Sequence, residues 1–206
     1  MVITKIEKQK KNKERYNISI DGDFAFGLYE DSLVKYGLRS GDELTAEKIK
    51  EMQEYDEFGY GKKVAYSFLA YKQRSKKELI KKLKLKKISD ASIEKIVELL
   101  EKQKYLNDEL FAGNFIEDKL NCRPIGKRLA KLKLSEKGID KEVIEETLNK
   151  IYSEDKEAEY AERVLEKYVK KVKYKDAVDK KNKCYRYLIS KGFDFDTVKK
   201  VLSIGY

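Results

Sequence analysis

The sequence predicts a mainly α-helical protein in which three tandem three-helix repeats form an elongated array, preceded by a small N-terminal β-containing extension, an antiparallel hairpin plus helix. Three observations carry this prediction. The 206 residues include a single proline and are rich in Lys, Glu, Leu and Ile, which favours helices. A helix-junction motif recurs about every fifty residues, which is typical of a repeat protein. The N-terminal residues instead alternate apolar and polar side chains around a turn signal, which indicates strands.

The N-terminal extension is expected to span residues 1–58. Three segments have strand character, and two of them flank the turn signal DGD: VITKIEK, YNISI and FAFGL (residues 2–8, 16–20 and 24–28). Residues 30–36 and 45–55 follow with helical patterns, and Thr45 is a candidate N-cap. We therefore expect a small antiparallel sheet followed by helices.

The junction motif is clearest at residues 137–143, KGIDKEV. Gly138 can adopt the left-handed conformation that ends a helix, and Asp140 can cap the next helix through its carboxylate. Ile139 and Ile144 have the spacing of a hydrophobic staple, which sets the angle at which the chain enters the helix. The motif therefore predicts a helix, a tight turn and a second helix.

The motif occurs in two further copies. The staple and cap positions are Phe193, Asp194 and Val198 in the last copy and Ile88, Ser89 and Ile93 in the first. Lys87 stands where the other copies have glycine. Each copy follows an amphipathic helix, and Asn107 and Ser153 are candidate N-caps. We expect the repeats to span residues 59–104, 105–152 and 153–206.

The second helix of each repeat is basic. RSKKELIKKLKL (residues 74–85) aligns with RPIGKRLAKLKL (residues 123–134). Ser75 and Glu78 have capping-box spacing, and Pro124 is expected in the first turn of its helix. These helices are the leading candidates for contact with a partner.

Several classes of function lack support. The absence of histidine excludes His-based triads and His metal ligands, and the glycines form no phosphate-binding loop. Cys122 and Cys184 are expected to be buried small hydrophobic residues rather than a disulfide or a zinc site. We expect no catalytic residues, no metal, no cofactor and no enzymatic activity. No segment resembles a membrane span or a signal peptide, so we expect a cytoplasmic protein.

The net charge of +10 is unevenly placed, with +8 in residues 60–100. Such an excess favours polyanionic partners, nucleic acid or an acidic protein surface. Three basic sets are the contact candidates: Lys72, Arg74, Lys76, Lys77, Lys81, Lys82 and Lys84 in the first repeat, Arg123, Lys127, Arg128 and Lys131 in the second, and Lys180, Lys181, Lys183 and Arg186 in the third. On a helix, Lys77, Lys81 and Lys84 would share one face.

Two alternatives stay open for these side chains. The lysines can equally be solvated helix faces with no partner. Tyrosines beside cations suggest stacking with single-stranded nucleic acid, but packing is the expected role because most lie near apolar helical positions. The tyrosines concerned are Tyr66, Tyr71, Tyr105 and Tyr187.

In their order and spacing, these segments resemble the RecX regulators of the bacterial recombinase RecA. The segments that carry the resemblance are RSKKELIKKL, YLNDELFAGNFIEDK, LSEKGID and RYLISKGFDFDTVKKVL. The resemblance runs from about Gly61 to the C-terminus, and the N-terminal extension is similar to that of longer members. Lys87 departs from the family pattern, in which glycine is common.

The resemblance implies a non-catalytic regulator that lodges in the groove of the RecA–DNA filament and mostly inhibits its ATP hydrolysis and strand exchange. Such a protein would act in homologous recombination, DNA repair and the SOS response. It would contact the recombinase and, more weakly and electrostatically, single- and double-stranded DNA, with no membrane partner, and we expect a monomer. The alternative is a stand-alone nucleic-acid-binding helical repeat protein.

Overall fold

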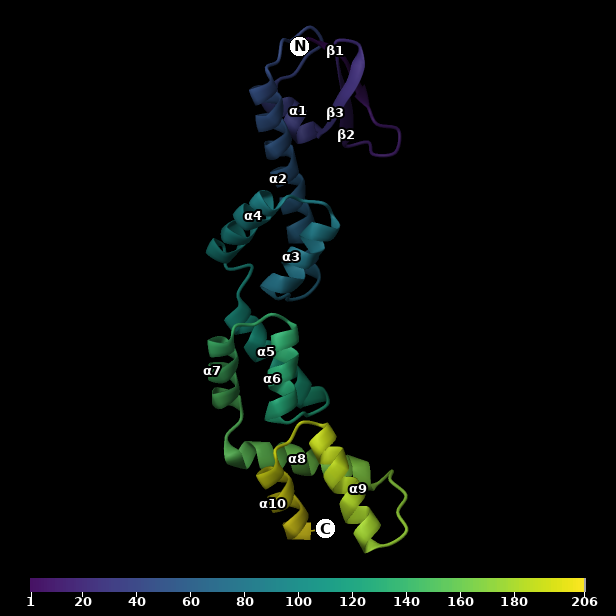
Figure 1. The fold of residues 1–206 in the computed structure, drawn as a ribbon, viewed down its shortest axis with the longest axis vertical. Helices are drawn as coiled ribbons and strands as arrows, with labels where there is room; N and C mark the ends of the chain where they lie inside the picture. Colours follow the sequence, from purple (N-terminus) through teal and green to yellow (C-terminus); the bar gives the residue numbers. More distant parts are fainter. Residues whose placement is uncertain (206) are drawn as a thin grey trace. The chain divides into compact units, whose positions relative to one another are not determined.

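The computed structural model describes residues 1–205, with side chains for residues 1–153 and 155–203. It confirms a mainly helical chain with a small N-terminal sheet (Figure 1). The chain divides into two compact units. The first contains Met1–Gln73 and Leu79–Tyr105, and the second contains Arg74–Glu78 and the residues from Leu106 onward.

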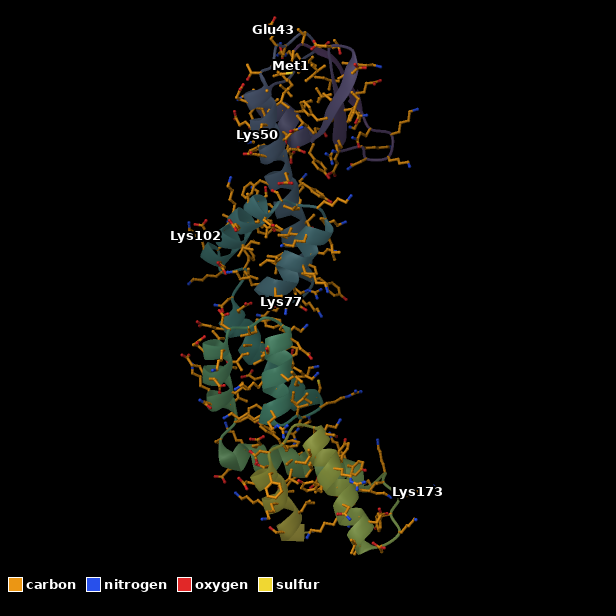
Figure 2. The ribbon with its side chains drawn as sticks, viewed as in Figure 1. Met1, Glu43, Lys50, Lys77, Lys102 and Lys173 are labelled. Atoms are coloured by element: carbon orange, nitrogen blue, oxygen red, sulfur yellow. The ribbon has the colours of Figure 1, made fainter. Side chains whose placement is uncertain are left out.

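The N-terminal sheet has three antiparallel strands in the order β1-β2-β3, as the sequence predicts. The strands are β1 (Ile3–Lys8), β2 (Arg15–Ile20) and β3 (Asp23–Tyr29). The turn residues Asp21 and Gly22 both have positive φ, 51° and 101°, which suits the right-handed twist of a tight hairpin. The chain start pairs with the loop before the second helix, since the Leu44 N–H donates to the Met1 carbonyl at 2.8 Å; Met1 and Glu43 are labelled in Figure 2.

Four helices follow, all in the first unit except the first turn of α3, which belongs to the second. They are α1 (Glu30–Tyr36), α2 (Ala46–Tyr71), α3 (Lys76–Leu85) and α4 (Asp90–Lys102). Thr45 caps α2 as expected, because its side chain accepts a hydrogen bond from the Lys48 N–H at 3.2 Å. Helix α2 is continuous through residues 58 and 59, where the sequence suggests a boundary between the extension and the first repeat. The domain division itself stays a prediction.

A buried carboxylate fixes the start of α1 on α2. Asp56 accepts hydrogen bonds from the Tyr29 N–H at 2.7 Å and the Ser32 hydroxyl at 2.6 Å. Because these donors satisfy a carboxylate that is only 6% exposed, the sheet, α1 and α2 pack as one body.

Six helices form the second unit. They are α5 (Asp108–Cys122), α6 (Lys127–Glu136), α7 (Lys141–Ile151), α8 (Glu154–Val169), α9 (Ala177–Ser190) and α10 (Phe195–Gly205). Helices α5, α6 and α7 enclose one apolar cluster, and α8, α9 and α10 enclose another. Each cluster corresponds to one predicted three-helix repeat, and Figure 1 shows the helices of each repeat grouped together.

The junctions at Gly138 and Gly192 have the predicted geometry, and the first junction shares it without a glycine. Gly138 and Gly192 have φ values of 79° and 84°, and Lys87 takes the same left-handed conformation at 60° although it carries a Cβ. All six staple residues are buried: Ile88, Ile93, Ile139, Ile144, Phe193 and Val198. Two of the capping predictions are confirmed in full, and two are confirmed in position only. The side chains of Asn107 and Asp194 accept the expected backbone N–H bonds, whereas Asp140 and Ser153 occupy the N-cap position without a side-chain bond.

The predicted alignment of the basic second helices is wrong by two residues. It pairs buried Leu83 with Leu132, which is 55% exposed, whereas the buried counterpart of Leu83 is Leu134. The repeated LKL pattern conceals the shift, because either leucine matches by residue type. As a result, Pro124 precedes the N-cap Gly126 and does not lie in the first turn of α6.

Two further properties bear on function. Cys184 is buried as expected, but the prediction for Cys122 is wrong, because this thiol is exposed at the end of α5. No helix in residues 1–205 combines the length and apolar character that crossing a membrane requires.

Candidate functional site

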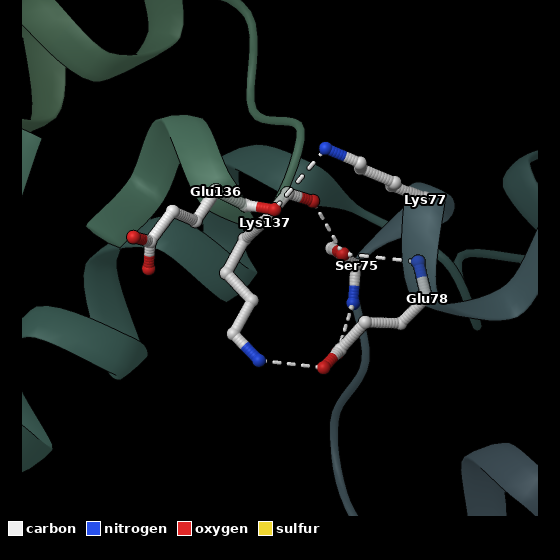
Figure 3. Close-up of polar contacts among 5 residues, drawn as sticks. All are labelled: Ser75, Lys77, Glu78, Glu136 and Lys137. Atoms are coloured by element: carbon white, nitrogen blue, oxygen red, sulfur yellow. Dashed lines mark hydrogen bonds and ion pairs between the residues drawn. The ribbon is translucent and has the colours of Figure 1, made fainter. Parts of the chain in front are cut away.

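The first turn of α3 is fastened to the end of α6 (Figure 3). The Ser75 N–H donates to Glu78 Oε2 at 3.2 Å and the Glu78 N–H donates to Ser75 Oγ at 3.3 Å, which confirms the predicted capping box. The Ser75 hydroxyl also donates to the Lys137 carbonyl at 2.7 Å. We call the contact of Arg74–Glu78 with Glu136–Gly138 the first joint.

Lysine side chains complete the first joint from both sides. Lys137 Nζ lies 2.6 Å from Glu78 Oε1, and Lys77 Nζ donates to the Glu136 carbonyl at 3.2 Å (Figure 3). The stem of Lys77 covers Gly138 so closely that a Cβ there would lie 2.7 Å from Lys77 Cβ. Lys77, predicted as a partner-contact residue, therefore also contacts the α6–α7 junction.

The ion pair sets the ionisation of Glu78. Burial alone would raise the pKa of this carboxyl group, but hydrogen bonds from Lys137 and the Ser75 N–H outweigh it and lower the pKa. The first joint therefore contains an ionised carboxylate at neutral pH.

Beyond its first turn, α3 has an apolar side and a basic side. Leu79 and Leu83 are fully buried. Lys82 lies 5.7 Å from the centre of the Phe68 ring, and Lys84 Nζ lies 3.0 Å from Asp90 Oδ1. Lys81 is exposed and forms no ion pair with any described residue. In the same set, Lys72 and Lys76 are exposed, and Arg74 is half-buried.

The start of α6 contacts the α9–α10 junction, just as the start of α3 contacts the α6–α7 junction. Here the contact is made by backbone groups. The Gly126 N–H donates to the Lys191 carbonyl at 2.9 Å and the Arg128 N–H donates to the Gly192 carbonyl at 3.1 Å. A Cβ on Gly126 would lie 2.2 Å from the Phe193 backbone nitrogen, and one on Gly192 would lie 2.3 Å from Leu129 Cβ. We call this contact of Ile125–Leu129 with Lys191–Phe193 the second joint.

An acid from the following repeat caps the helix start at both joints. Asp108 accepts from the Lys76 N–H and Glu157 accepts from the Lys127 N–H, each at 2.9 Å. Glu157 is only 5% exposed, and this burial raises the pKa of its carboxyl group. The negative charge of nearby Asp194 raises the pKa further, whereas the hydrogen bond from the Lys127 N–H partly offsets the increase. The sequence gives no signal that this acid is buried.

Two of the four side chains in the second basic set have partners within the chain. Lys127 Nζ donates to Asn149 Oδ1 at 2.9 Å, and Lys131 pairs with Glu145. Arg123 and Arg128 are exposed.

In the third basic set, as in the second, some side chains have partners within the chain. Lys183 Nζ lies 2.8 Å from both Asp179 Oδ2 and the Lys173 carbonyl oxygen. Lys173 lies in the loop before α9 and is labelled in Figure 2. Lys180 lies 5.5 Å from the centre of the Tyr174 ring. Lys181 and Arg186 are exposed. The roles of all three sets in partner contact remain predictions.

A cavity of about 380 Å³ in the second unit gathers cations that the sequence did not single out, apart from Arg123. Its cationic lining residues, which define what we call the basic pocket, are Lys119, Arg123, Lys133, Lys167 and Lys191. They come from α5, the α5–α6 link, α6, α8 and the end of α9. Because no two adjacent positions contribute, a search for basic runs could not find this site.

The tyrosines divide between packing and exposure. Tyr187 stacks on Tyr168 with ring centres 3.8 Å apart, which confirms packing there. Tyr66 is half-buried and meets the edge of Tyr105. Tyr71 is 83% exposed and Tyr105 is 62% exposed, so the expected packing role is wrong for Tyr71 and incomplete for Tyr105.

Sequence models of four RecX domains match consecutive parts of the chain. The Regulatory protein RecX N-terminal domain matches residues 1–45. The first, second and third three-helix domains of RecX match residues 62–100, 107–148 and 154–202. The matches cover the sheet and all three helix triples.

Full-length relatives and solved structures agree with these matches. The Regulatory protein RecX of Clostridium beijerinckii is 36% identical, over 98% of this chain and 96% of the relative, and that of Staphylococcus aureus is 34% identical, over 98% and 73%. A crystal structure of regulatory protein RecX superposes with a TM-score of 0.72 at 26% identity, covering 98% of both chains. The crystal structure of RecX from Lactobacillus salivarius gives 0.66 at 28% identity, covering 72% of this chain and 96% of that one. The chain therefore belongs to the RecX family of regulatory proteins.

Proposed function

We propose that this chain binds the filament that a RecA-type recombinase forms on DNA, lodges in its groove, and restrains its ATP hydrolysis and strand exchange. Membership in the RecX family carries this proposal, because the family is named for regulation. The chain would act as a monomeric, non-enzymatic protein of the cytoplasm, in homologous recombination, DNA repair and the SOS response.

The charge distribution supports a nucleoprotein partner. The excess of +8 in residues 60–100 includes exposed lysines on α3 and just before it, among them Lys72 and Lys81. Such side chains can meet phosphates or acidic surfaces without giving up a partner within the chain.

An ATP-hydrolysis titration tests the proposal. A RecA-type recombinase on single-stranded DNA is mixed with increasing amounts of this chain, and the steady-state rate of hydrolysis is measured. We expect the rate to fall at substoichiometric or near-equal ratios. A rate that stays constant across a wide titration would show that the proposal is wrong.

A charge-reversed variant locates the contact. Lys72→Glu with Lys81→Glu should raise the concentration for half-inhibition at least about tenfold, the change that a loss of about 1.4 kcal/mol in binding gives. Lys10→Glu with Lys50→Glu is the matched control, because both side chains are exposed in the same unit and the charge change is equal. Equal inhibition by the two variants would return Lys72 and Lys81 to the role of solvated surface.

The second candidate function is stand-alone nucleic-acid binding, which the same basic excess favours. It predicts tight binding to naked DNA or RNA, with an affinity that falls steeply with salt, about one logarithmic unit per contacted phosphate. Tight filament binding with weak binding to naked DNA would exclude this alternative.

A further inference from the structure

We propose that the basic pocket is a docking site for an acidic peptide segment of a partner protein, in which a large apolar side chain is flanked by carboxylates. The proposal goes beyond filament inhibition and does not depend on it, because neither the pocket nor its test involves a recombinase.

The charge of the pocket is one-sided. It is lined by five cations and, among the described residues, by no acid. None of the five forms an ion pair with a described acid, whereas Lys84, Lys131 and Lys183 elsewhere all do. A larger depression of about 930 Å³ in the first unit, by contrast, is lined by three lysines and three glutamates. Unneutralised like charges repel one another, so an anionic ligand relieves a strain that the chain leaves uncompensated.

The floor of the pocket is apolar. The aliphatic side chains are Pro124, Ile125, Leu129 and Val164. The volume of about 380 Å³ lies within the range of about 300–1,000 Å³ that ligand pockets occupy. A cationic rim above an aliphatic floor matches an apolar anchor between carboxylates, since the anchor fills the floor while the rim pairs with the acids.

The aromatic geometry favours a peptide over a nucleobase. A base bound by a single-strand platform needs a free aromatic face on which to stack. Tyr187 is the aromatic residue of the described lining, and one face of its ring is stacked on Tyr168 at 3.8 Å. Lys191 Nζ lies 5.1 Å from the centre of the Tyr187 ring and competes for a place on it. The remaining apolar surface is aliphatic, which suits a side chain such as Phe or Leu.

Fluorescence anisotropy with designed peptides tests the proposal on the full chain. The probe is a labelled peptide Asp-Glu-Asp-Phe-Asp-Glu, and its control replaces Phe by Ser. At about 50 mM salt, we expect the Phe peptide to bind at least about tenfold more tightly than the Ser peptide. Equal binding of the two peptides would mean simple charge attraction and would overturn the proposal.

Matched variants locate the binding. Arg123→Glu with Lys167→Glu should weaken binding of the Phe peptide at least about tenfold, because both cations lie on the rim. Lys141→Glu with Lys171→Glu changes the charge equally at exposed positions outside the lining and should leave binding within about twofold. An equal loss in both variants would contradict the proposal.

A milder variant separates binding from folding. Lys133→Gln with Lys167→Gln removes two of the crowded charges without reversing them, and we expect weaker peptide binding with an unchanged or higher thermal midpoint. A lower midpoint with unchanged peptide binding would show that these cations are structural. A short oligo-dT that binds more tightly than the Phe peptide, and that loses affinity in the same variants, would assign the pocket to nucleic acid instead.

Discussion

The two joints of the second unit solve the same packing problem with opposite chemistry. The first joint is built from side chains: the Ser75 hydroxyl, the Glu78–Lys137 ion pair and the stem of Lys77. The second joint is built from backbone. Two N–H groups donate to carbonyl oxygens, and two glycines lie so close to the facing chain that a Cβ on either would clash.

This difference indicates which joint can tolerate substitutions. Long side chains adjust to a substitution, whereas backbone pressed against backbone cannot move without opening the contact. We therefore expect the second joint to be the rigid and mutation-sensitive one, and the first to tolerate substitution better. Four predictions test this comparison, in order of decreasing effect.

Truncating the staple residue at each junction should have the largest effect. Phe193 is fully buried at the second joint, so Phe193→Ala should lower the free energy of unfolding by about 3–5 kcal/mol. Ile139→Ala, directly after the first joint, removes a smaller side chain and should cost less. Urea unfolding followed by circular dichroism measures both. A loss under about 1 kcal/mol for Phe193→Ala would contradict its tight packing.

Adding a methyl group to each junction glycine should have the next largest effect. Gly192→Ala places a Cβ against Leu129 in a left-handed residue and should cost about 2–4 kcal/mol. Gly138→Ala has the same conformational strain, but the three atoms nearest to its Cβ all belong to the Lys77 side chain, whereas at Gly192 one of them is the Leu129 backbone nitrogen, so Gly138→Ala should cost less. Thermal melts of the two variants compare them directly. Equal losses would mean that the contact is no tighter at the second joint.

Two acids should give opposite pH dependence. The pKa of Glu78 is lowered in the folded chain, so its contribution to stability is present above 4.5 and is lost as the pH falls through the folded pKa. The pKa of Glu157 is raised, so stability is highest below 4.5 and falls as the pH rises from there through the folded pKa. Glu78→Gln should therefore cost about 1–2 kcal/mol at neutral pH and little in acid.

Glu157→Gln should instead gain stability relative to the parent chain as the pH rises above 4.5, because the amide oxygen can still accept from the Lys127 N–H. Unfolding curves for both variants between about pH 3 and 8 measure these trends. Parallel pH profiles for the two variants would refute the contrast between the joints.

Replacing Lys87 should have the smallest effect. Its left-handed conformation, with φ of 60°, strains a residue that carries a Cβ. Lys87→Gly should stabilise the chain by about 0.5–1 kcal/mol, because relief of strain exceeds the entropic cost of glycine. Differential scanning calorimetry would detect the higher midpoint. A lower midpoint would mean that the Lys87 side chain contributes contacts that outweigh the strain.

The sequence predicts elements that depend on local chemistry. The DG hairpin, the left-handed glycines of the last two junctions and the buried staples all follow from neighbouring residues, and the structure confirms them. Contacts between distant segments do not follow in this way. Nothing near Glu157 indicates that its carboxylate will be buried at the start of α6.

The candidate site divides along the same line. The basic runs on α3, α6 and α9 are visible in the sequence, but their partners are not, and Lys77 proved to be engaged at a joint. The basic pocket collects single cations from five segments, so only the folded chain brings them together. The two-residue error in aligning α6 arose because residue type alone could not distinguish buried Leu134 from exposed Leu132.

The left-handed lysine at residue 87 also bears on how the series of repeats begins. Each joint is heterologous, because a helix start in one repeat meets a different surface, a junction, in the next. An open junction could therefore accept a helix start from another molecule. Repeated contacts of this kind build filaments. At Gly138 and Gly192 the incoming helix start leaves too little room for a Cβ. Lys87 carries a Cβ and an exposed charged side chain at the corresponding place, so a helix start that approached this junction as closely would meet that Cβ.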